Sequence, residues 1–502
     1  MKNKMFLLSA LFSISTAMAS EKTQQYFETI KSNPKQLAIF LKNMPKGGDL
    51  HNHTGGSSLA ENMIRYAKND KLCIDHRSFA VKDSPICPKE NLLANSTQQN
   101  HLYNTLIDDW SMRHFHPGKE TGHDHFFATF DKYLPILLMH DPEIISETVE
   151  KAGEQNELYI ELMDLPDQMT SAMLGKKVGW DPDFEKMREK LLSAGLTTIV
   201  DGISKQIDVY QAKINSSLSC GTKKAKPGCN VTVRYLYQPL RNQPKEQVFA
   251  QLLTGFETGN KDPRFVGINL VQPEDNQIAM RDYHLHMRMI GFLHHLYPNV
   301  HISLHAGELS PSLVPPAGLR FHIRDAIETA DAERIGHGVD ITHEDHSEQL
   351  LQEMAKKHIL VEINLSSNAA TLNIKGKNHP LPLYMRYNVP VALSTDDEGI
   401  LRTNLTEQYK IAILTYHFSY PTIKKLVRNS IAYSFLPGHT LWNDYDYKNI
   451  VNACEKDSLG AETISSSCQE FLDTNEKARM QWMLEKQFVK FEKEFTNIHQ
   501  IN

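Results

Sequence analysis

The chain has 502 residues, 40% of them hydrophobic and 23% charged, which is typical of a globular protein with one large domain or a few smaller ones. Its formal net charge of -6 comes with no long run of lysine or arginine, which argues against a nucleic-acid partner or a membrane surface. We therefore expect a small neutral substrate.

The first residues have the pattern of a secretory signal. Lys2 and Lys4 precede a short apolar run, and the small residues at positions 17 and 19 form a cleavage site before Ser20. We expect residues 1–19 to be removed and the mature chain to be periplasmic or secreted. The apolar run is too short to span a membrane, and no later run approaches the roughly 20 residues that a span requires.

The cysteines are consistent with export, because disulfides persist in oxidising compartments. The six cysteines fall in three local groups of two, separated by long gaps. Short loops close at the lowest entropic cost, so we expect sequential pairing. A thiolate zinc site is the weaker alternative, since no CxxC spacing occurs. The expected pairs are Cys73 with Cys87, Cys220 with Cys229, and Cys454 with Cys468.

The segment from Pro45 to Ser57 contains two histidines, His51 and His53, on either side of an asparagine and ahead of two glycines. Side chains alternate faces along a strand, so histidines two apart point the same way. This spacing presents two nitrogen ligands to a metal on a rigid edge. The alternative is two ordinary histidines near a turn.

Residues 59–157 show helical periodicity and are expected to form a helical insertion after the first strand. The histidines of this region are interpreted as structural or as part of a lid, because residues two apart on a helix point in different directions. The same argument applies to His284 and His286. The region also contains three phenylalanines that could cover a substrate, although their helical spacing favours core packing: Phe126, Phe127 and Phe130.

From there the chain alternates short β-rich runs with helical segments. Together with the first strand, these runs make eight predicted strands. Buried strands separated by helices predict parallel βα units, so we expect a (β/α)8 TIM barrel of the α/β class. After Thr403 the sequence is helical, which predicts the last barrel helix and a helical tail over residues 403–502. The expected runs are residues 157–164, 231–238, 264–271, 300–308, 334–341, 359–366 and 389–397.

Polar side chains fall at the carboxyl ends of these runs, where barrel enzymes assemble their active sites. Zinc favours histidine nitrogens with a carboxylate oxygen, and a water could complete its coordination. A bound zinc ion lowers the pKa of water from about 15.7 to about 7. The sequence therefore predicts one Zn²⁺ per chain, held by His51, His53, His305 and Asp396.

Activating a water also requires a proton acceptor and an orienting group, for which Asp397 and His337 are candidates. Glu308 follows His305 by three residues, and as a protonated acid it could donate to a ring nitrogen of the substrate. Glu362 and Asn364 alternate on one strand and either brace the site or pack the interior. Asp49 either positions the first strand or caps a turn, and we favour the cap.

Four motifs, MPKGGDLHNH, SLHAGE, RIGHG and LSTDD, occur in an order that resembles the adenosine/AMP deaminase family of the amidohydrolase superfamily. The signal peptide makes the chain similar to the secreted, growth-factor-related branch. The resemblance implies zinc-dependent hydrolysis of adenosine to inosine and ammonia, with His51, His53, His305 and Asp396 as metal ligands. It further implies that Glu308 protonates N1 of the purine. His337 and Asp397 would position and activate the attacking hydroxide.

The chain departs from the family pattern in three places. Gly55 replaces an aspartate that reaches the ribose in the classical adenosine enzymes. The family's glycine-aspartate-glutamate turn is here Gln272, Pro273 and Glu274, which keeps only the glutamate, and Glu398 stands where many relatives have proline. The resemblance therefore leaves the preferred 6-aminopurine open, whether adenosine, adenine or deoxyadenosine.

Two other classes of function compete with a purine deaminase. A different amidohydrolase would commonly carry a metal-bridging lysine on the fourth strand, and residues 264–272 contain none, which favours a mononuclear site. A noncatalytic extracellular signalling protein is suggested only by the secreted branch. A cytidine-deaminase type of zinc site is excluded, because HxE with PCxxC does not occur. The oligomeric state is open, with a homodimer among the options.

Overall fold

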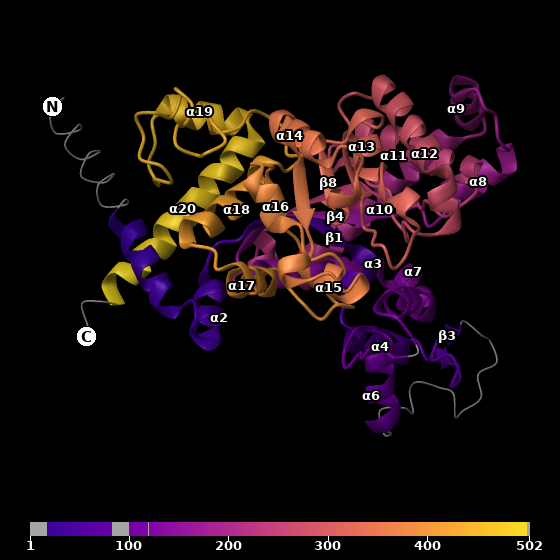
Figure 1. Cartoon of the computed structure of the whole chain (residues 1–502), viewed down its shortest axis with the longest axis horizontal. Coiled ribbons are helices and arrows are strands. Elements are labelled where there is room, and N and C mark those ends of the chain that lie inside the picture. The colour runs from indigo at the N-terminus through magenta and orange to yellow at the C-terminus, as the bar shows by residue number, and fades with distance from the viewer. Residues whose placement is uncertain (1–17, 83–99, 119, 499–502) are drawn as a thin grey trace.

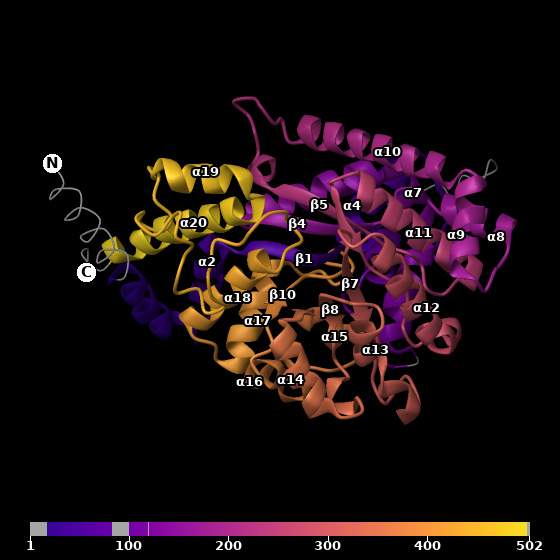
Figure 2. The ribbon, with the colours of Figure 1, turned by 90° about the horizontal axis from the view of Figure 1, so that it is seen from above.

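The computed structural model describes residues 18–82, 100–118 and 120–498. Eight parallel strands form one sheet in the order β1-β4-β5-β6-β7-β8-β9-β10. Helices lie around the outside of this sheet (Figures 1 and 2). The strands are β1 Gly47–His53, β4 Glu157–Asp164, β5 Thr232–Tyr237, β6 Phe265–Ile268, β7 His301–Ala306, β8 Arg334–His337, β9 Leu360–Ile363 and β10 Val391–Leu393.

The sheet closes between its first and last strands. The backbone N–H of Asp396 donates to the carbonyl of His51 at 2.8 Å, and that of His53 donates to the carbonyl of Asp396 at 3.3 Å. These bonds continue the parallel pairing just beyond the end of β10, so the predicted TIM barrel is confirmed. Each strand lies within a few residues of its predicted run.

Asp49 lies at this closure and does not cap a turn. Its side chain is buried in β1 and accepts hydrogen bonds from the Thr395 hydroxyl at 2.5 Å and from the Asn52 amide at 3.4 Å. The preferred expectation for Asp49 is therefore wrong, because the carboxylate links β1 to the segment after β10.

The strands are buried because both of their faces are covered. All eight residues of β4 are buried, and the main core cluster joins the barrel to its surrounding helices. These helices are α8 Thr170–Val178, α9 Phe184–Ser193, α10 Leu196–Ser217, α11 Lys245–Lys261, α12 Gln277–Leu296, α13 His322–Glu328, α14 Ser347–Lys357, α15 Leu365–Thr371, α16 Leu381–Arg386, α17 Leu405–Tyr416 and α18 Tyr420–Ala432.

The insertion between β1 and β4 carries its own small hydrophobic cluster. Its helices α4 and α6 project from the barrel, away from α19 and α20 (Figure 1). The long helix α7 bends at His140, two residues before an internal proline, Pro142. The elements are α3 Thr54–Ser57, α4 Ala60–Asn69, β2 Cys73–Ile74, β3 Val81–Lys82, α6 Asn100–Asp109 and α7 Gly122–Glu154, with β2 and β3 antiparallel.

The C-terminal segment adds α19 Ser466–Thr474 and α20 Glu476–Ile498. Helix α20 lies beside helix α2 Pro34–Asn43 (Figure 1). The ring centroids of Phe40 and Phe491 lie 5.0 Å apart between the two helices. None of the helices in the described ranges is long and apolar enough to cross a membrane.

Two of the three predicted disulfides are present. Cys220 bonds Cys229, and Cys454 in the loop before α19 bonds Cys468 in the first turn of α19. The third predicted pair includes Cys87, which lies outside the described residues, as does most of the predicted signal peptide.

Candidate metal centre and active site

All of the side chains that the sequence predicts for the site lie together at the carboxyl end of the barrel. His51 and His53 end β1, His305 lies near the end of β7, and His337 is the last residue of β8. The acidic groups follow strand ends, Glu308 after β7 and the pair Asp396 and Asp397 after β10.

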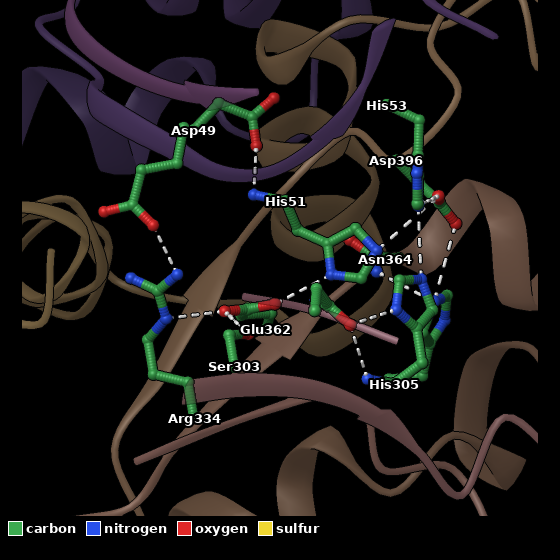
Figure 3. Close-up of polar contacts among 12 residues, drawn as sticks. Asp49, His51, His53, Ser303, His305, Arg334, Glu362, Asn364 and Asp396 are labelled. Carbon is green, nitrogen blue, oxygen red and sulfur yellow. Dashed lines mark hydrogen bonds and ion pairs between the residues drawn. The ribbon is translucent and has the colours of Figure 1, made fainter. Parts of the chain in front are cut away.

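Three histidine Nε2 atoms and one carboxylate face a common point. His53 Nε2 lies 3.2 Å from His305 Nε2 and 3.4 Å from Asp396 Oδ1, and His51 Nε2 lies 3.6 Å from the same oxygen. Figure 3 shows these groups turned toward one another. A tetrahedral metal with bonds of about 2.0 Å has ligand atoms about 3.3 Å apart, so these three separations fit such an ion.

The hydrogen bonds of the three rings also fit a metal. His51 Nδ1 lies 2.7 Å from Glu362 Oε2, His53 Nδ1 lies 3.2 Å from Gln238 Oε1, and His305 Nδ1 lies 2.7 Å from Asn269 Oδ1. Each Nδ1 therefore carries the proton, and each Nε2 keeps a lone pair. Two lone pairs facing each other at 3.2 Å repel without a cation between them.

The Asn269 amide is held in this orientation, because its Oδ1 also accepts from the backbone N–H groups of His305 and Leu270. His51 Nε2 is buried and has no hydrogen-bond partner among the described residues. The residues present therefore suit a divalent metal with nitrogen and oxygen ligands.

Glu362 braces His51 from below. Its other carboxylate oxygen accepts from the Ser303 hydroxyl at 2.8 Å and lies 2.7 Å from Arg334 Nε (Figure 3). Glu362 and Arg334 are both buried, so the guanidinium offsets the charge of the carboxylate inside the barrel. Of the two interpretations of Glu362, bracing of the site is the one the contacts support.

Two site residues have strained backbones. His337 has φ 69° and Asp396 has φ 63°, in the left-handed region that costs a non-glycine residue about 1 kcal/mol or more. Asp396 is held there by the two backbone bonds that close the barrel. Gly56 makes room for Asp397, because a Cβ at this position would lie 1.9 Å from Asp397 Oδ1.

Burial and neighbouring charge tune the two acids beside the cluster. Burial, with the charges of Asp396 and Glu274, raises the pKa of Glu308 to about 8. Burial and the adjacent Asp396 carboxylate hold the pKa of Asp397 well above its usual range. Glu308 is therefore protonated at neutral pH and can donate a proton, and Asp397 holds a proton more strongly than an ordinary carboxylate does.

A cavity of about 600 Å³ opens over the cluster. Helix α7 forms one wall through Phe126, Phe127 and Phe130, and Gln272 and Pro273 lie in the lining with the catalytic candidates. The expectation that the three rings only pack the core is therefore incomplete, because they also face the cavity. The histidines on α7 do not line this cavity, and His123 Nε2 lies 3.0 Å from Asp275 Oδ1.

The sequence did not indicate the hydrogen-bonding roles of several side chains around the site. Gln238 and Asn269 orient ring nitrogens from neighbouring strands, and Glu274 accepts the backbone N–H groups of Gly307 and Glu308 at 3.1 and 2.8 Å. Their positions at the ends of β5 and β6 were the available signal. Glu398, which had no explanation, is buried and pairs with Lys151 of α7 at 2.6 Å.

A family model described as adenosine deaminase matches residues 107–441. An adenosine deaminase of Clostridium perfringens is 27% identical over 402 residues, which cover 79% of this chain and 95% of the relative.

Two solved structures share the fold. The N6-methyl-AMP deaminase of Arabidopsis thaliana has a TM-score of 0.52 and 19% identity, covering 80% of this chain and 94% of that one. A zinc-bound COG1816 amidohydrolase from Burkholderia ambifaria has a TM-score of 0.50 and 15% identity, covering 80% of this chain and 88% of that one.

Proposed function

The chain belongs to the adenosine deaminase family, and from this premise we propose that it hydrolyses adenosine to inosine and ammonia with one Zn²⁺ per chain. One observation carries this proposal. Three histidine Nε2 atoms and the Asp396 carboxylate converge beside protonated Glu308, which lines the cavity. The zinc-bound neighbour supports the choice of metal.

When bound, a zinc ion supplies a Lewis acid that lowers the pKa of water toward neutrality. Asp397 accepts a proton from the attacking water, and His337 orients that water. Glu308 donates its proton to N1 of the purine, which makes C6 electrophilic. The oxygen adds to C6, and Asp397 then passes its proton to the amino group. The C6–N bond breaks, ammonia leaves, and the new hydroxyl proton returns to Glu308 as the 6-oxo group forms.

The charges around the cavity favour a nucleoside over a nucleotide. Away from the metal cluster the wall carries three further carboxylates, Asp131, Asp141 and Asp164, and among the described residues no lysine or arginine lines it. Asp164 Oδ2 is buried without a hydrogen-bond partner in the described chain. The Asp131 carboxylate repels phosphate. Burial raises the pKa of Asp141 to about 6 and that of Asp164 well above its usual range, and both carboxyl groups can form hydrogen bonds with hydroxyl groups. The cavity therefore suits ribose and disfavours AMP.

Gly55 supports a second candidate, in which adenine or deoxyadenosine is preferred. A Cβ at Gly55 would face the apolar side chains of Leu137 and Phe130, at 3.7 and 3.8 Å. No side chain at this position can bind a ribose hydroxyl. Any ribose recognition must then come from the acidic wall.

The proposal also includes the location of the enzyme, which we expect to be exported. A signal peptide over residues 1–19 and the cysteine pairs support a periplasmic or secreted enzyme, similar to the secreted branch of the family. Disulfides such as Cys220 to Cys229 are stable in such compartments.

The test is ammonia release by the purified mature chain from adenosine, deoxyadenosine, adenine and AMP. We expect turnover of adenosine with kcat/KM at least tenfold above that of AMP. Asp131→Lys should narrow this difference by placing a cation on the wall. The matched control is Asp124→Lys, because Asp124 is exposed on the same helix and does not line the cavity. A preference for AMP in the unaltered enzyme, or no ammonia from any of the four, would contradict the proposal.

A further inference from the structure

His337 lies beside the metal cluster, and what it can do depends on which ring nitrogen carries its proton. A neutral imidazole has one donor and one acceptor nitrogen. Its Nε2 lies 3.7 Å from Asp396 Oδ2, at the floor of the cavity. If Nε2 carries the proton, Nε2 is a hydrogen-bond donor. If Nδ1 carries the proton, Nε2 has a lone pair and is an acceptor.

A chain of buried hydrogen bonds leads to the other nitrogen, Nδ1. The backbone N–H of Leu381, at the start of α16, donates to His379 Nδ1 at 3.1 Å. His379 Nε2 lies 3.0 Å from Asn368 Oδ1, and Asn368 Nδ2 lies 2.9 Å from His337 Nδ1. The side chains of His379, Asn368 and His337 are all buried.

The directions of these bonds follow from the first one. A backbone N–H can only donate, so His379 Nδ1 is an acceptor. Burial lowers the pKa of His379 to about 4, so its single proton is on Nε2 and is donated to Asn368 Oδ1. The Asn368 amide is thereby held with its NH₂ group toward His337 Nδ1, which must accept.

We propose that Asn368 and His379 are positioning residues that keep the proton of His337 on Nε2, so that His337 presents an N–H group to the reacting water. The start of α16 thereby sets the hydrogen-bonding role of a side chain at the end of β8. This deepens the proposed deamination and, for its effect on rate, rests on it.

Two other groups near His337 do not oppose this assignment. Asn364 Nδ2 lies 3.4 Å from His337 Nε2, but Asn364 Oδ1 has no partner among the described residues. Nothing therefore holds that amide, and turning it over places its oxygen as an acceptor for the Nε2 proton. Glu308 Oε1 lies 3.8 Å from His337 Nδ1, beyond hydrogen-bond distance.

The arrangement would also keep His337 outside the proposed ligand set, although it lies within the buried group of His51, His305 and Asp396. A ring nitrogen that carries a proton cannot bind a metal. His51, His53 and His305 each have Nδ1 next to an acceptor oxygen, and His337 has Nδ1 next to a donor.

The direct test is ¹⁵N NMR of the zinc-loaded protein labelled at histidine, without substrate. The signals of His337 are identified by their loss in His337→Gln. We expect an unprotonated Nδ1 and a protonated Nε2. A protonated Nδ1 would overturn the proposal, and because no turnover is measured, this result is independent of whether adenosine is the substrate.

Two sets of variants test the effect on rate. In Asn368→Asp the carboxylate accepts from His379 and draws the His337 proton to Nδ1, so we expect kcat to fall about 10²-fold or more, with zinc content and KM little changed. The same substitution at exposed Asn378 is the matched control and should leave kcat unchanged.

His379→Gln keeps a donor for Asn368 and an acceptor for Leu381, so its kcat should stay within about tenfold of that of the unaltered enzyme. His379→Phe has neither group, so its kcat should fall as far as that of Asn368→Asp. This comparison stands even if Asn368→Asp fails to fold. Equal kcat in His379→Gln and His379→Phe, or an unchanged His337 spectrum in His379→Phe, would contradict the assigned role.

Discussion

Glu308 shows how the surroundings of one residue decide its chemistry. A carboxyl group in water is ionised at neutral pH and could not serve as an acid. Burial beside the Asp396 and Glu274 charges raises the pKa of Glu308 to about 8. The Gly307 and Glu308 backbone N–H groups are held by Glu274, so the acid is also fixed in position.

Glu308→Gln tests this role. Glutamine keeps the shape of the side chain but has no acidic proton, so we expect ammonia release to fall by about 10²- to 10⁴-fold while the zinc content stays the same. Full activity of Glu308→Gln would show that Glu308 is not the proton donor.

The pKa of Glu308 also predicts a pH profile. The acid must be protonated, so activity is present below its pKa and declines as the pH rises through about 8. The logarithm of kcat/KM should fall by one for each pH unit above that value. The residual activity of Glu308→Gln should lack this alkaline decline, and a decline that persists unchanged in the variant would assign it to another group.

The residues of the site were predictable where they carry their own chemistry in a motif. His51, His53, His305 and Asp396 are of the type that binds metals, and they follow predicted strands. Asn368 and His379 were not predictable, because a neutral amide and a histidine in a loop carry no signal until their hydrogen bonds are known. The role of Asp49 was assigned wrongly because its partner, Thr395, is on the opposite side of the barrel closure.

At the scale of elements, the strands were predictable because burial on both faces favours runs rich in apolar residues, although β4 also contains Glu157, Glu161 and Asp164. The insertion was predicted as helical, and α4, α6 and α7 confirm this, but the short β2 and β3 pair was not foreseen. Two residues per strand are too few to show a periodicity. The dual role of Phe126, Phe127 and Phe130 also depends on how α7 lies over the barrel.

The disulfide between Cys454 and Cys468 is expected to stabilise the tail. It joins the loop after α18 to the start of α19, and both sulfurs are buried in the small C-terminal cluster. Replacing both cysteines with serine should lower the free energy of unfolding of this segment by about 3 kcal/mol, measured by thermal and urea denaturation.

A reducing agent should lower the stability of the unaltered protein and have less effect on the double-serine variant, which has already lost one bond. Equal stability of the variant and the unaltered protein would show that the tail does not depend on this bond.

At the scale of the whole molecule, the site exists only because the sheet closes. His51 and Asp396 are separated by most of the chain, yet their backbones are hydrogen bonded to each other where β1 meets the segment after β10. The same contact brings together metal-ligand candidates from both ends of the barrel. A bound ion therefore connects β1, β7 and the β10 end, and metal binding should stabilise the closed barrel.

Metal removal is the measurement that tests the central claim most directly. The purified mature protein is treated with a chelator, dialysed, and assayed for ammonia release from adenosine before and after stepwise addition of Zn²⁺, with the melting temperature recorded on the same samples. We expect the metal-free protein to lose activity and to melt at a lower temperature, and both properties to return with one equivalent of zinc per chain. Undiminished ammonia release by metal-free protein, or a zinc-loaded protein that releases none, would contradict the account.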